Sequence, residues 1–193
     1  IAVLILSVFI GTQLAYVLNR FKFFGNTLIR NLFLVACQLP GVAMQIAVYE
    51  MMYKLGFINN MFGYILMTCG TDVISIYIYI QFFENIDYSL DESAIMDGAS
   101  YFTIFYRILL PLLKPAIVTA CILKGVGTYN EYYNANLYLQ DKKRYATVAT
   151  SLYTFVGPLG SKYTLICAGV IISLIPALVV FLIFQKQIYS GLT

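Results

Sequence analysis

The chain has 193 residues, of which 61% are hydrophobic and only 11% are charged, and its mean hydropathy is +0.81. Because a soluble domain carries about 25% charged residues, this composition excludes a water-soluble, disordered or fibrous protein. The net charge of +3 is small and dispersed, which argues against a nucleic-acid partner, and the absence of histidine removes the most versatile general base and metal ligand.

Five apolar segments are each close to the length that spans a bilayer as a helix, which is about 20 residues. In chain order they cover residues 1–18, 28–49, 61–83, 116–139 and 163–184. The pattern predicts an all-α fold, a polytopic membrane helical bundle in contact with lipid. We expect residues 1–193 to form one transmembrane domain, without catalytic residues or a metal site.

The longest polar connection, residues 84–115, contains five of the nine acidic residues. Ser89 and Glu92 have the spacing of a capping box. In this motif the side chain of each residue accepts a hydrogen bond from the backbone N–H of the other residue. This spacing predicts a short helix that runs to about Asp97.

A second short helix is expected directly after the first. Gly98 can adopt the left-handed conformation that ends a helix, and Ser100 can cap the helix that follows. Pro111 is expected to end that second helix. The connection should therefore form a helix, a sharp turn and a second helix outside the membrane.

The same connection resembles the EAA loop of permease subunits from binding-protein-dependent ABC importers. The family pattern is E-A-A, three residues, G, nine residues and I-x-L-P, and this chain matches every spacing, with Ser93 in place of the middle alanine. The stretch Asp97-Gly98-Ala99-Ser100 is similar to the sequence that sugar-type permeases have at this point of the EAA loop. The resemblance assigns ATPase coupling to Glu92, Ser93, Ala94, Asp97, Gly98, Ala99, Ile108, Leu110 and Pro111.

The resemblance implies a membrane subunit of an ATP-driven sugar or oligosaccharide importer, similar to the second permease of maltose-type systems. Its implied partners are cytoplasmic ATPase subunits, a second homologous permease and an extracytoplasmic substrate-binding protein. ATP and magnesium would bind the ATPase subunits, and this chain is expected to bind no cofactor and to be no enzyme, since it has no G-x-x-x-x-G-K-[ST] motif.

The resemblance also implies a location and a topology. The chain would lie in a bacterial or archaeal-type plasma (inner) membrane, with residues 84–115 cytoplasmic and 141–162 external. Such permeases usually have six spans. The chain begins inside an apolar run at Ile1 without methionine, so we expect a first span to be missing.

Polar residues inside the spans are costly and usually face a cavity or a partner. In the fourth segment, Asn130 and Asn134 are four residues apart and should share one face of a continuous helix. Together with Tyr129 and Glu131 they have side chains that suit sugar hydroxyls, so we expect them to line a translocation path. The alternative is that these residues hydrogen-bond to neighbouring helices or lie at the outer interface of the membrane.

Two charged residues leave other functions open. Asp72 and Lys124 would form a structural ion pair or lie in the path. With Glu131 they would instead form the relay of an ion- or proton-coupled secondary transporter, in which case the loop spacing is a coincidence. A permease for a non-sugar solute is a further alternative.

Overall fold

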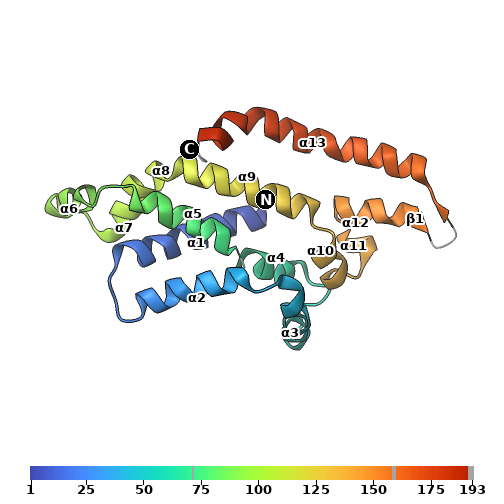
Figure 1. Ribbon diagram of the computed structural model, residues 1–193, viewed down its shortest axis with the longest axis horizontal. Coiled ribbons are helices and arrows are strands. Elements are labelled where there is room, and N and C mark those ends of the chain that lie inside the picture. Colours follow the sequence, from blue (N-terminus) through green and yellow to red (C-terminus); the bar gives the residue numbers. More distant parts are fainter. Residues whose placement is uncertain (71, 158–159, 191–193) are drawn as a thin grey trace.

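A computed structural model describes residues 1–70, 72–157 and 160–190 of the chain (Figure 1). The structure is built of helices, with one two-stranded hairpin. In chain order the elements are α1 (Ala2–Arg20), α2 (Asn26–Gln38), α3 (Gly41–Lys54), α4 (Met61–Gly70), α5 (Val73–Glu84), α6 (Ser89–Met96), α7 (Tyr101–Thr103), the π-helical η1 (Ile104–Leu109), α8 (Leu110–Leu112), α9 (Lys114–Asn130), α10 (Tyr133–Tyr138), α11 (Lys142–Tyr145), α12 (Val148–Leu152), η2 (Tyr153–Phe155), β1 (Val156–Gly157), β2 (Gly160–Ser161) and α13 (Tyr163–Ser190).

The described helices provide between two and five membrane spans. Helix α1 and residues 163–185 of α13 are each long and apolar enough to cross a bilayer alone. Three bent pairs qualify when each is taken as one span: α2 with α3, α4 with α5, and residues 101–112 with α9, bent by 107°, 43° and 70°. The upper number equals the five apolar segments of the sequence.

The core lies where α1, α5 and α9 meet the helices that follow α5. Its members include Ala15 on α1, Tyr79 and Phe83 on α5, and Ala116 on α9, all at most 1% exposed. Gly11 lets α1 approach α5 closely, because a Cβ built at this position lies 3.0 Å from the Tyr79 ring. Small residues at helix contacts favour such close packing in membranes.

Helix α13 runs along the outside of this core and contacts mainly α9 and α12 (Figure 1). Its most apolar window contains no buried residue. A hydrogen bond attaches α13 to α9: the Tyr129 hydroxyl of α9 donates to the Ser173 carbonyl of α13 at 2.9 Å. An apolar helix exposed to this extent needs lipid or another protein against it.

Candidate functional site: a helical coupling element and a polar cavity

Residues 84–115 lie at one end of the molecule, and α10, α11 and α12 lie at the opposite end (Figure 1). Residues of α2, α4, α5, α9 and α10, with Asp72 and Glu131 from the connections between helices, line a cavity. The two regions contain all the residues to which the sequence assigned a function, apart from Tyr129 and Asn130.

Helix α6 is present, but the predicted capping box at its start is wrong. Ser89 is already the first helical residue, so its side chain lies one position too late to cap the helix, and it accepts no cap hydrogen bond. Asp87 takes this role, since its Oδ1 accepts a hydrogen bond of 2.9 Å from the Ser89 N–H. The bond stabilises the ionised carboxylate and lowers the pKa of Asp87.

The turn after α6 confirms the prediction for Gly98. This residue has a φ of +78°. Its N–H donates to the Ile95 carbonyl and the Ala99 N–H donates to the Ala94 carbonyl, both at 2.9 Å. These two bonds form a Schellman motif, which satisfies the last carbonyls of α6 and fixes the direction of the following chain.

The second helix starts at the predicted cap but does not end at Pro111. The Ser100 hydroxyl accepts a hydrogen bond of 3.3 Å from the Thr103 N–H. The helical path then continues through η1 and α8, and the 70° bend falls after Leu112. Pro111 is one of the first two residues of α8, directly after the π segment, and the first turn of a helix is where proline is best tolerated.

The helix–turn–helix of residues 89–112, which we call the coupling element, has one buried face and one exposed face. Ala94, Ile104 and Leu109 are at most 7% exposed and belong to the core. Of the other residues that the sequence placed in this element, Ala99, Ile108 and Leu110 are half-buried, whereas Glu92, Ser93, Asp97, Gly98 and Pro111 are exposed. Met96 and Phe102, which are 87% and 70% exposed, extend this face.

A buried ion pair that the sequence did not predict attaches the coupling element to α1. Arg20 Nη2 lies 3.1 Å from Asp91 Oδ2, with side chains only 8% and 6% exposed. The same nitrogen donates a hydrogen bond of 3.0 Å to the Ile86 carbonyl. Burial raises the pKa of the Asp91 carboxyl, and the charge of Arg20 opposes this rise. The available signal was a basic residue at the end of the first apolar segment and an acid on the inner face of α6.

Replacing Gly98 with valine should destabilise the turn of the coupling element. A Cβ at this position meets no atom within 4 Å, so the penalty is backbone strain alone, about 1–2 kcal/mol for a left-handed L-residue. Gly98→Asn is the matched control, because asparagine tolerates this conformation better. Equilibrium unfolding in detergent compares the two variants, and equal stabilities would contradict the assignment of strain to this residue.

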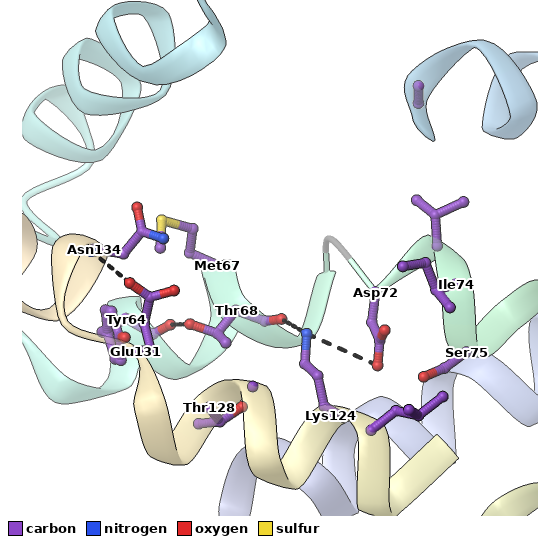
Figure 2. A pocket seen from close by; sticks show the side chains of 14 residues that line it. Tyr64, Met67, Thr68, Asp72, Ile74, Ser75, Lys124, Thr128, Glu131 and Asn134 are labelled. Carbon is purple, nitrogen blue, oxygen red and sulfur yellow. Dashed lines mark hydrogen bonds and ion pairs between the residues drawn. The ribbon is translucent and has the colours of Figure 1, made fainter. Parts of the chain in front are cut away.

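The cavity has a volume of about 540 Å³ and a lining that mixes polar and apolar side chains (Figure 2). Its lining residues are Ala36, Tyr64, Met67, Thr68, Asp72, Val73, Ile74, Ser75, Leu123, Lys124, Gly127, Thr128, Glu131 and Asn134. Lys124 points toward Asp72 across the wall: its Nζ lies 3.8 Å from Asp72 Oδ2 and donates a hydrogen bond of 2.9 Å to the Thr68 carbonyl. The expected ion pair of Asp72 and Lys124 is therefore present.

The fourth apolar segment is not one continuous helix, and this corrects the prediction that Asn130 and Asn134 share a helix face. Helix α9 ends at Asn130, and Glu131 is extended with φ −69° and ψ 109°. The Glu131 Oε1 accepts a hydrogen bond of 2.9 Å from the Asn134 N–H, the donor that a continuous helix would pair with the Asn130 carbonyl. A side chain thus replaces a backbone acceptor and breaks the helix.

The break separates the four residues proposed for a translocation path. Glu131 and Asn134 line the cavity. Asn130 is exposed outside this lining, and Tyr129 packs toward α13 through its bond to the Ser173 carbonyl. Within the described residues, no cluster of three or more histidine, cysteine, aspartate or glutamate side chains is placed to hold a metal ion.

Comparison with known proteins connects these features. Residues 5–192 match the family described as "Binding-protein-dependent transport system inner membrane component". An arabinooligosaccharides transport system permease protein of Bacillus subtilis is 29% identical over 98% of this chain and 66% of its own length. A galactooligosaccharides permease protein of the same organism is 33% identical, with 94% and 65% covered.

A trehalose/maltose transport system permease protein of Thermococcus litoralis is 32% identical over 97% of this chain and 68% of its own length. The chain therefore spans about two thirds of the length of these relatives. Among solved structures, a chain of a bacterial ABC transporter involved in the import of the acidic polysaccharide alginate superposes with a TM-score of 0.86, at 24% identity over 96% of this chain and 70% of that chain. At this identity the match establishes the fold.

Proposed function

Because the chain belongs to the family of binding-protein-dependent transport system inner membrane components, we propose that it is a permease subunit of an ATP-driven importer of sugars or oligosaccharides. The named relatives support the sugar class, since they are permease proteins for arabinooligosaccharides, galactooligosaccharides and trehalose or maltose. The proposed partners are ATPase subunits, which bind ATP and magnesium, a second permease and a substrate-binding protein.

The observation that carries this proposal is the form of the coupling element. Its Schellman turn and its core contacts make it rigid, while Met96, Tyr101 and Phe102 are more than half exposed. Exposed apolar side chains gathered on a rigid element are typical of a protein–protein contact. We assign this face to an ATPase subunit, which places residues 84–115 in the cytoplasm and residues 141–162 outside.

Motion of the ATPase subunit would reach the spans through this element. Arg20 and Asp91 connect it to α1, and buried Ile104 and Leu109 connect it to the core. A packed core transmits displacement because it has few voids to absorb it. The cavity then serves as this subunit's part of the path, with Glu131 and Asn134 as polar contacts for sugar hydroxyls.

The test reconstitutes the full-length chain in liposomes with its partner permease, ATPase subunits and binding protein. We expect loaded binding protein to stimulate ATP hydrolysis and to drive sugar uptake. Met96→Glu should abolish co-purification of the ATPase subunits, because it brings a charge into an apolar contact, whereas Met96→Leu should retain it. Uptake driven by an ion gradient without ATP would refute the importer and favour a secondary transporter.

A further inference from the structure

The cavity lining contains three side chains that are charged at neutral pH, and two of them neutralise each other. Asp72 and Lys124 face each other at 3.8 Å, with side chains 11% and 17% exposed. The ammonium group of Lys124 is additionally held by the Thr68 carbonyl at 2.9 Å. This pair is fixed in the wall and brings no net charge to the cavity.

Glu131 is the third charged side chain, and it forms no ion pair with any residue that the structure describes. Among the described residues, its carboxylate accepts a hydrogen bond from a neutral donor, the Asn134 N–H. Figure 2 shows Glu131 where α9 ends, away from Lys124, which points to Asp72. Two carboxylates against one ammonium leave the cavity with one net negative charge, located at Glu131.

We propose that Glu131 makes this cavity selective for uncharged polyhydroxylated solutes and excludes anionic ones, such as oligosaccharides that contain uronic acids. A single charge in a cleft with low-dielectric walls acts strongly on other charges, because little water screens it. Repulsion of the wrong solute is one of the two ways in which a site achieves specificity. The hydroxyls of a neutral sugar can instead donate hydrogen bonds to the carboxylate.

This inference rests on the proposed function only in that the solute enters this cavity, and its test does not need ATP. In a variant of the full-length chain without native cysteines, assembled with its partners, Thr128→Cys places a thiol in the cavity lining. Two methanethiosulfonate reagents of similar size modify this thiol, one with a cationic trimethylammonium group and one with an anionic sulfonate group. The experiment compares the rates of the two modifications. The same pair of rates at Thr154→Cys, an exposed position outside the cavity, corrects for intrinsic reactivity.

We expect the corrected ratio of cationic to anionic rates to be about tenfold in favour of the cation, the lower end of what a charged cleft produces. Glu131→Gln should remove this preference, and it preserves the fold because its amide oxygen still accepts from the Asn134 N–H. Glu50→Gln is the matched control: Glu50 is exposed on α3 and pairs with Lys54, so the ratio should stay unchanged.

Protection by solutes gives the second measurement. A neutral oligosaccharide should slow modification of the Thr128→Cys variant, a uronic-acid oligosaccharide of the same length should not, and Glu131→Gln should allow both to protect. A ratio that Glu131→Gln leaves unchanged, or equal protection by both sugars while Glu131 is intact, would overturn the inference. If the ratio of modification rates is as expected but the reconstituted complex shows no ATP-driven sugar uptake, the proposed function is refuted instead.

Discussion

Replacing Arg20 with methionine should destabilise the protein by about 3–5 kcal/mol, because it leaves the Asp91 carboxylate buried without its counter-charge. Both side chains of the pair are less than 10% exposed, so water cannot take the place of the guanidinium. Burial already raises the pKa of Asp91, and removal of Arg20 takes away the charge that opposes the rise. The measurement is the free energy of unfolding in detergent, together with ATPase-subunit binding.

Arg30 provides a matched control for this prediction. It pairs with Glu84 at 2.7 Å, but its side chain is 34% exposed and that of Glu84 is 50% exposed. Arg30→Met should therefore cost roughly 0–1 kcal/mol, as exposed pairs do. The double variant Arg20→Met with Asp91→Leu should recover much of the lost stability, since it removes the uncompensated charge. Equal costs for Arg20→Met and Arg30→Met would show that burial does not matter here.

The parts of the coupling element that the sequence predicted depend on neighbours within a few residues. The left-handed turn at Gly98 and the cap at Ser100 are set by local backbone geometry. Even there, the cap of α6 falls on Asp87 instead of Ser89, because both side chains are good caps and the start of a helix is uncertain by one or two residues.

The features that the sequence did not predict depend on contacts across the fold or on competition between acceptors. Arg20 and Asp91 are far apart in the chain, and only the packing of α6 against α1 brings them together. Glu131 ends α9 because its carboxylate competes with the Asn130 carbonyl for the Asn134 N–H. The spacing of apolar residues does not indicate which of the two acceptors forms the bond. The pairing of Asp72 with Lys124 could be predicted because an unpaired charge inside a membrane span is costly and such residues usually form ion pairs.

Replacing Gly11 with valine should separate α1 from α5 and destabilise the protein by about 1–3 kcal/mol, the usual cost of overpacking a filled core. A Cβ at this position lies 3.0 Å and 3.3 Å from two carbons of the Tyr79 ring and 3.7 Å from Ile76. Tyr79 is only 1% exposed, so its ring has no space into which it can move. Unfolding in detergent measures the loss of stability.

Gly125 on α9 is the matched control, since it too lies within a helix of the bundle. A Cβ there lies 3.7 Å from Leu4, which is an ordinary contact, and the position borders an apolar cavity of about 700 Å³ that accepts two more methyl groups. Gly125→Val should therefore be nearly neutral, because valine is also a somewhat better helix former than glycine. If Gly11→Val proved as mild as Gly125→Val, the close approach of α1 to α5 would not be what stabilises the packing of these two helices.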